Sequence, residues 1–188
     1  IAQCLLQDAL LQFARMHQNI QLTIETSINF VALNRSEADI VIRSTPNPPE
    51  HLVGRRLFPY FLCEYAAKGY LDKTRPEDRR WLTFARSLSG RDWIENSSFP
   101  EAPVGLSSDD LVWLLGAAKA GEGMIRTACY MADPDPGLQR LPGAEPSQAH
   151  DLWVLTHPDL KNAPRIKHLT RHLANALEDK RDLIQGRL

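Results

Sequence analysis

The chain has 188 residues, 43% of them hydrophobic and 24% charged, which suits one large domain or two closely joined small ones. Its 22 basic and 23 acidic residues give a formal net charge of −1, which excludes a globally basic surface that would attract nucleic acid. The apolar runs are too short for a membrane span, and the widely spaced Cys4, Cys63 and Cys129 exclude a zinc module and fit a reducing cytoplasm.

Residues 1 to 17 have the spacing of an amphipathic helix, with the main apolar side chains on one wide arc. Cys4 and Leu11 interrupt the polar side and lie seven residues apart, one above the other. A helix that packs only against the core of its own domain needs no apolar strip on its polar side, so Cys4 and Leu11 indicate a surface that binds a partner. The alternative is that they are isolated hydrophobic residues at the surface. Because the chain opens inside this helical pattern, we expect further residues upstream of Ile1.

The next elements favour an α/β fold. Residues 20 to 25 alternate between apolar and polar types, which predicts a strand with one buried face. A short helical piece covers residues 31 to 33, and residues 39 to 43 resemble a strand buried on both faces, as in a parallel sheet. Together they predict a βαβ unit. Further strands are predicted at residues 52 to 58 and 60 to 65.

A second subdomain is expected from about residue 81, where a strand at 81 to 84 follows an unpatterned charged segment. A strand at 103 to 106 leads into Ser107 and Ser108, which we expect to cap a helix from Leu111 to Ala120 that stops at Gly121. Short strands are predicted at residues 123 to 128 and 152 to 155. The last helix begins after Asn162 and carries an apolar stripe made of Ile166, Leu169, Leu173 and Leu177.

Motifs for catalysis are weak. His168 and His172 have the spacing of a metal-binding pair, but no cysteine or paired carboxylate is near, which favours a solvated helix face. The sequence around Ser107 lacks the second glycine of a nucleophile elbow, and the Gly-Glu-Gly at 121 to 123 follows a helix instead of opening one. We therefore expect no catalytic residue, no metal and no cofactor, and predict that the protein is not an enzyme.

Four stretches, in order, resemble the effector-binding domain of LysR-type transcriptional regulators. Residues 13 to 25 contain Phe-Ala-Arg and Leu-Thr-Ile-Glu, and residues 37 to 43 read Glu-Ala-Asp-Ile-Val-Ile-Arg before Leu-Val-Gly-Arg-Arg-Leu at 52 to 57. Residues 117 to 125 read Ala-Ala-Lys-Ala-Gly-Glu-Gly-Met-Ile, and residues 152 to 160 read Leu-Trp-Val-Leu-Thr-His-Pro-Asp-Leu. Glu122 departs from the leucine that is common in the family at this turn.

The resemblance implies a fold like that of type 2 periplasmic binding proteins, with two Rossmann-like α/β subdomains joined by crossover strands. Subdomain I would contain residues 1 to 63 and 158 to 188, and subdomain II residues 64 to 157. The DNA-binding winged helix-turn-helix and the first strand of the family would precede Ile1. The implied function is that of a cytoplasmic sensor, in which a small molecule in the cleft between subdomains alters oligomer geometry and transcription. The alternative is a periplasmic solute-binding protein of a transporter.

In open α/β sheets, ligands bind beyond the carboxyl ends of strands. The effector-binding residues predicted on this basis are Thr26, Ser27, Arg43, Ser44, Tyr65, Ser107 and Ser108. Arg43 could bind an anionic effector or form a salt bridge with Glu37 or Glu64, and Tyr65 could equally serve the core.

The family resemblance also implies a homodimer or tetramer, in which the first helix and the strand after it pair with the same elements of a second copy. The residues predicted at this interface are Cys4, Leu11, Gln21, Thr23 and Glu25.

Overall fold

The computed structural model describes residues 1–26, 38–85 and 92–187. The chain divides into two compact units: unit 1 comprises Ile1–Tyr60 and Ala149–Arg181, and unit 2 comprises Phe61–Gln148 and Asp182–Leu188. The described strands form a seven-stranded sheet in the order β1-β7-β2-β5-β3-β4, with β6 paired to β2. Strands β2 (Val53–Ala67) and β7 (Ser147–Thr156) contribute residues to both units. The subdomain borders expected near residues 63 and 157 stay a prediction.

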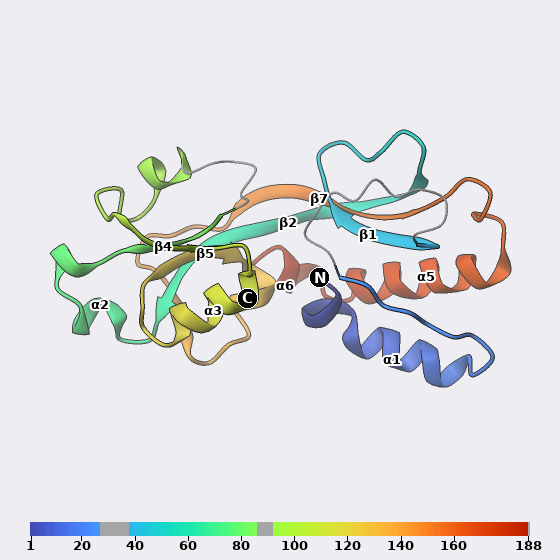
Figure 1. Ribbon diagram of the computed structural model, residues 1–188, viewed down its shortest axis with the longest axis horizontal. Coiled ribbons are helices and arrows are strands. Elements are labelled where there is room, and N and C mark those ends of the chain that lie inside the picture. Colours follow the sequence, from blue (N-terminus) through green and yellow to red (C-terminus); the bar gives the residue numbers. More distant parts are fainter. Residues whose placement is uncertain (27–37, 86–91, 188) are drawn as a thin grey trace. The chain divides into compact units, whose positions relative to one another are not determined.

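Unit 1 is built from strands on one side and two helices on the other. β1 (Ile40–Ser44) pairs antiparallel with β7, and α5 (Pro164–Glu178) lies between these strands and α1 (Gln7–Met16) (Figure 1). A π-helix, η1 (Ala2–Leu6), leads into α1, so the first predicted helix is confirmed with a wider first turn. The predicted stripe of α5 is confirmed at Ile166, Leu173 and Leu177, which are buried together with Ala174, whereas Leu169 is only half-buried.

In unit 1, one strand prediction is wrong and another is right about the strand but wrong about its surroundings. Residues 21–26 have no regular structure, and Ile24, which should face the core, is 55% exposed. A strand needs a hydrogen-bonding neighbour, and no strand in the described part of the chain pairs with this segment. The strand predicted at 39 to 43 is confirmed as β1, but its partner β7 is antiparallel. Its residues are only half-buried, because β1 stands at the end of the strand order. The helical piece predicted at 31 to 33 lies outside the described residues.

The strand candidates at 52 to 58 and 60 to 65 are one continuous strand, β2, which runs through Pro59. Proline lacks the backbone N–H but has a φ that extended structure tolerates, so it does not interrupt the strand. The strand predicted at 152 to 155 is the second half of the longer β7.

Unit 2 has a sheet with a hydrophobic cluster on each face. β3 (Trp81–Phe84) pairs parallel with β4 (Val104–Ser108) and β5 (Met124–Ala128), while β2 pairs antiparallel with β5 and with β6 (Leu138–Arg140). One cluster packs against α3 (Leu111–Lys119) and α4 (Cys129–Ala132). The other lies against α2 (Tyr70–Lys73) and the 3-10 helix η3 (Asp92–Asn96). Figure 1 shows α3 and η3 on opposite sides of these strands.

Two short elements complete the description: the 3-10 helix η2 (Pro76–Asp78) and α6 (Arg181–Ile184). The predicted strands at 81 to 84 and 123 to 128 are confirmed as β3 and β5.

α3 begins at Leu111 as predicted, but its N-cap is not one of the predicted serines. Ser107 and Ser108 belong to β4, and the N-cap is Asp110, whose Oδ1 accepts the N–H groups of Val112 and Trp113. A carboxylate is as good a cap as a serine hydroxyl, so the sequence pattern was shifted by two residues. The predicted stop is confirmed, because Gly121 has a φ of +87° that side chains rarely adopt.

Candidate functional site

A row of polar side chains crosses the sheet of unit 2 near the carboxyl ends of its parallel strands. Thr83 lies opposite Ser107 in the β3–β4 pair, and Glu64 lies opposite Arg126 in the β2–β5 pair. The register of β3 and β5 places Thr83 level with Arg126, since the preceding residues are partners. Side chains alternate between faces, so the row occupies the face opposite α3. We name as the polar row Ser107, Thr83, Arg126 and Glu64.

The neutral half of the row consists of Thr83 and Ser107, whose side chains contact each other. The hydroxyls of Thr83 and Ser107 lie 2.7 Å apart in a hydrogen bond, and Thr83 is buried. The neighbouring Ser108 Oγ accepts the N–H of Asp110. Because Asp110 Oδ1 already accepts the N–H groups of Val112 and Trp113, these first amides of α3 are not available to a ligand.

The charged half of the row begins with Arg126. Its Nη2 donates to Ser147 Oγ at 2.9 Å, and the Ser147 hydroxyl in turn donates to the Leu62 carbonyl. The guanidinium also lies over the ring of Trp93, 5.4 Å from its centroid, a cation–π arrangement. Trp93 is held by an edge-on contact with the fully buried Trp81, at 4.9 Å between ring centroids. Arg126 is therefore fixed by side chains from several elements.

Glu64 is fixed separately. Its Oε2 accepts the backbone N–H of Ser98 at 2.9 Å. Although Glu64 and Arg126 are cross-strand partners, no ion pair joins their charged groups within the described residues. Both instead line a pocket of about 530 Å³ within unit 2. Its other polar lining residues are Asn96, Ser97, Ser98, Glu145 and Ser147.

Tyr65, a predicted site residue, lies on the opposite face of the same strand and is fully buried. Its hydroxyl donates to Asp133 Oδ1 at 2.9 Å, and Asp133 also receives two hydrogen bonds from Arg140. Burial, the largest effect, and the neighbouring Cys129 and Asp133 raise the pKa of Tyr65, so it stays a neutral donor. The pKa of Arg140 is raised by its hydrogen bonds to Asp133. These contacts give Tyr65 a place in the core, the second use that the sequence allowed.

The predicted effector residues of unit 1 are dispersed. Arg43 and Ser44 end β1, Thr26 is exposed in the irregular segment, and Ser27 lies outside the described residues. Glu37, a possible partner of Arg43, is also outside them. The Ser44 Oγ is buried and has no hydrogen-bond partner in the described part of the chain. Leaving a buried hydroxyl unbonded costs about 1–3 kcal/mol, so the Ser44 hydroxyl is suited to a hydrogen bond with a ligand.

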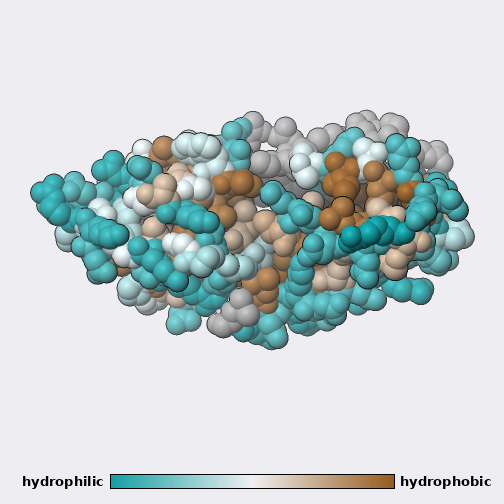
Figure 2. All heavy atoms as spheres, turned by 90° about the horizontal axis from the view of Figure 1, so that it is seen from below, coloured by the Kyte–Doolittle hydropathy of each residue, from teal (hydrophilic) through white to brown (hydrophobic). Residues whose placement is uncertain are grey.

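The predicted interface residues lie at the surface of unit 1. Leu11 is 51% exposed and Cys4 is exposed, as the apolar strip required. The polar residues Gln21, Thr23 and Glu25 are exposed too, although they do not belong to a strand. Figure 2 shows hydrophobic atoms gathered in patches among hydrophilic ones on the face seen from below.

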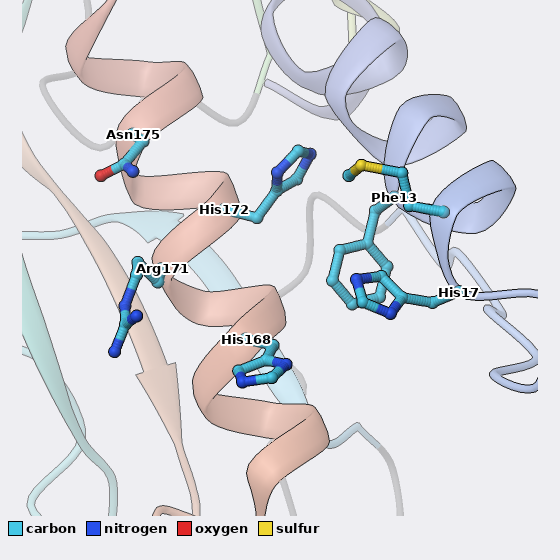
Figure 3. A pocket seen from close by; sticks show the side chains of 7 residues that line it. Phe13, His17, His168, Arg171, His172 and Asn175 are labelled. Atoms are coloured by element: carbon cyan, nitrogen blue, oxygen red, sulfur yellow. The ribbon is translucent and has the colours of Figure 1, made fainter.

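The two histidines of α5 differ in their surroundings: His168 is exposed, as the sequence predicts, whereas His172 is half-buried against α1. His172 shares a hydrogen bond of 2.8 Å with the Ala9 carbonyl of α1 and packs against Phe13. His168 lies beside His17, with ring centroids 6.3 Å apart. Figure 3 shows these side chains around a pocket of about 230 Å³ between α1 and α5. The helix therefore has two packed faces, and the polar one serves the contact with α1.

Two kinds of site are absent from residues 1–26, 38–85 and 92–187, the part of the chain that the structure describes. In this part of the chain no three histidine, cysteine or acidic side chains are grouped so that they could hold a metal ion. No helix there is both long and apolar enough to cross a bilayer.

Sequence reasoning missed the charged half of the row. Glu64 was considered only as a partner of Arg43, and Arg126 was not considered at all. A signal was present, because Arg126 is the one charged residue in the strand Met-Ile-Arg-Thr-Ala. A charge in an otherwise buried strand is unusual unless it has a partner or a function.

The family model of the LysR substrate binding domain matches residues 1–178. No curated protein matches the chain. The regulatory domain of CrgA, a LysR-type transcriptional regulator from Neisseria meningitidis, is 19% identical, with a TM-score of 0.79 over 94% of this chain and 93% of that one. The AmpR effector binding domain from Citrobacter freundii is 19% identical, with a TM-score of 0.74 over 95% and 94%. The regulatory domain of AphB in Vibrio vulnificus is 15% identical, with a TM-score of 0.70 over 93% of each chain. The mixed α/β fold expected from the sequence is confirmed.

Proposed function

This chain belongs to the LysR substrate binding domain family, and on that premise we propose that it binds a small-molecule effector in the pocket of unit 2. The observation that carries the proposal is the separation of Arg126 from Glu64 on the pocket wall. A guanidinium has five N–H donors, and among the described residues its hydrogen bond goes to Ser147 alone. Charged groups with spare hydrogen-bonding capacity in a concave site are what a polar ligand needs.

The two serines predicted at the end of β4 stay predictions as effector contacts. Ser107 belongs to the polar row and Ser108 follows it, but neither residue lines the pocket of unit 2. In unit 1, the unbonded hydroxyl of Ser44 supports a role in binding. Thr26, Ser27, Arg43 and Tyr65 stay predictions as effector contacts, as does a cleft between subdomains.

The regulatory part of the proposal concerns transcription. A ligand changes a protein's state only if it binds two states with different affinity, so the effector must favour one arrangement of the regulator. We propose that this arrangement changes how a DNA-binding domain upstream of this chain meets DNA in the cytoplasm. The family match favours a regulator over the solute-binding protein of a transporter.

Effector binding is testable by differential scanning fluorimetry of the 188-residue chain with a panel of metabolites. A ligand that binds the native state raises Tm, and the rise grows with the logarithm of the ligand concentration once that concentration exceeds Kd. We expect at least one compound to do so, and Arg126→Gln to remove the shift. Arg55→Gln, which changes an exposed arginine of unit 1, should leave it intact.

The same samples separate a sensor from an enzyme. Mass spectrometry of the bound compound after long incubation should return it unchanged. Conversion to a product would contradict the sensor, and a panel in which no compound raises Tm would contradict the effector pocket.

We also propose that a second copy of the chain covers the exposed strip of α1. Burying a leucine side chain contributes about 1.5–3 kcal/mol, and a two-fold interface counts it twice, so Leu11→Asp should weaken the dimer by about 3–6 kcal/mol. Sedimentation velocity at tens of micromolar measures this. Gln139→Asp, which adds the same charge at an exposed position of β6, is the control. A wild-type monomer, or a dimer indifferent to Leu11→Asp, would remove this proposal.

A further inference from the structure

The pocket of unit 2 holds two opposite charges apart. Residues directly opposite in an antiparallel pair have Cβ atoms about 4.5–5.5 Å apart, and opposite charges at such positions normally attract each other. Arg126 and Glu64 occupy such positions. Arg126 is instead drawn to Ser147 and Trp93, while Glu64 is drawn to the N–H of Ser98. The fold therefore presents a separated cation and anion to the same space.

The third charged group of the lining is also informative. Glu145 is an exposed carboxylate at the rim, so the pocket combines one guanidinium with two carboxylates. A simple anion would gain from Arg126 but would be repelled by Glu64 and Glu145. A simple cation would gain from the carboxylates but would leave Arg126 unsatisfied. Only a ligand with both charges complements all three groups.

The neutral lining agrees with a small polar ligand. η3 and the residues after it supply Asn96, Ser97 and Ser98, which offer donors and acceptors beside the charges. A volume of about 530 Å³ lies in the range of small-molecule sites, about 300–1,000 Å³, and exceeds what one inorganic ion would fill.

We infer that the effector is a compact zwitterion, a molecule such as a free amino acid whose carboxylate pairs with Arg126 and whose ammonium pairs with Glu64. This inference rests on the proposed function and names the ligand class of its site. Arg126 is suited to the carboxylate because a guanidinium can offer two parallel N–H groups to two oxygens. Glu64 Oε1, the oxygen that does not receive the Ser98 N–H, is the acceptor for the ammonium.

The test uses ligands that differ by one charge. Isothermal titration calorimetry on the 188-residue chain compares each standard amino acid with the 2-hydroxy acid and the amine that carry the same side chain. We expect at least one amino acid to bind, and both its single-charge analogues to bind about tenfold to hundredfold more weakly, as loss of one charged hydrogen-bonding partner predicts.

Two variants assign the charges. Arg126→Gln should abolish the advantage of the amino acid over the amine, and Glu64→Gln should abolish its advantage over the hydroxy acid. Glu122→Gln removes an exposed carboxylate after α3 and should change neither ratio. Far-ultraviolet circular dichroism and Tm establish that each variant is folded before it is titrated.

The outcomes separate the two proposals. A hydroxy acid that binds as tightly as its amino acid, with loss of binding in Arg126→Gln, would overturn the zwitterion and leave the effector pocket standing. Binding of other panel compounds without any amino acid would do the same. No binding by the amino acids, their analogues or the wider metabolite panel would overturn both.

Discussion

Each face of the unit 2 sheet carries an arginine and an acidic residue, and the two pairs are arranged in opposite ways. On the α4 side, Arg140 donates from Nε to Asp133 Oδ1 at 2.9 Å and from Nη2 to Oδ2 at 2.7 Å. Tyr65 adds a third hydrogen bond to the same carboxylate. On the η3 side, Arg126 and Glu64 are direct cross-strand partners but bind other groups.

The difference separates charges that serve the fold from charges that are available to a ligand. We call Arg140 and Asp133 the closed pair. The Arg140 Nη2 also donates to the Gly186 carbonyl, so this pair links the segment at Gly186 to the sheet. All its oxygens have partners, and an additional ligand would have to displace one. We call Arg126 and Glu64 the open pair. These two side chains have spare donors and acceptors, and a ligand can use them without breaking a contact of the native fold.

The largest effect is expected where the closed pair is broken. Asp133→Ala removes the carboxylate that accepts from Arg140 and from the buried Tyr65 hydroxyl, and removing one partner of a buried ion pair costs about 3–5 kcal/mol. Because the Arg140 side chain is 28% exposed, we expect the lower end, about 3 kcal/mol. Urea denaturation measures it. Asp182→Ala, at a side chain 72% exposed, should cost less than about 1 kcal/mol. Equal losses in the two variants would show that the Asp133 network does not hold unit 2 together.

A smaller effect is expected in the neutral half of the polar row. Ser107→Ala removes the partner of the buried Thr83 hydroxyl, at a cost of about 1–3 kcal/mol. Adding Thr83→Val replaces that hydroxyl by a methyl group of similar shape, so the double variant should recover most of the loss. Denaturant midpoints of the two single variants and the double variant give the coupling. Additive losses would mean that the two hydroxyls do not depend on each other, and Ser107 would then resemble the open pair.

Elements whose evidence is local in the sequence were predicted well. The apolar spacing of α1 and α5 and the positive φ needed at Gly121 are written within a few neighbouring residues. The segment at 20 to 25 failed because alternation describes only one strand, whereas a sheet requires a second one. His172 was misplaced for a related reason, since its hydrogen bond goes to Ala9 on a helix 163 residues away.

The candidate site shows the same limit. Ser107 was predicted because a strand end is visible in the sequence around it. Arg126 and Glu64 are 62 positions apart, and only the register of β2 with β5 brings them together. Their separate partners, Ser147 and Ser98, come from further segments of the chain. No periodic pattern in the sequence predicts these contacts between distant segments, although a single charged residue in a buried strand indicates a candidate position.

The smallest effect is expected at the open pair, and it is the one on which the comparison depends. Glu64→Gln keeps an acceptor for the Ser98 N–H, and Arg126→Gln loses one hydrogen bond and a partly exposed cation–π contact. Each should therefore change the free energy of unfolding by less than about 1 kcal/mol without ligand. In a double-mutant cycle the two residues should be additive within about 0.5 kcal/mol, as for groups that do not interact.

The cycle with Asp133→Ala and Arg140→Gln supplies the contrast, because residues that share a network couple by about 0.5–3 kcal/mol. A coupling above about 1 kcal/mol between Arg126 and Glu64 would mean that their two charged groups attract each other in solution. The pocket would then be closed by its own ion pair, a zwitterion would have to break that pair to bind, and the distinction between the two faces would disappear. The open arrangement requires that the effects of the Arg126 and Glu64 substitutions be additive without ligand and strongly coupled when an amino acid is bound. In that case the ligand alone connects the two charges.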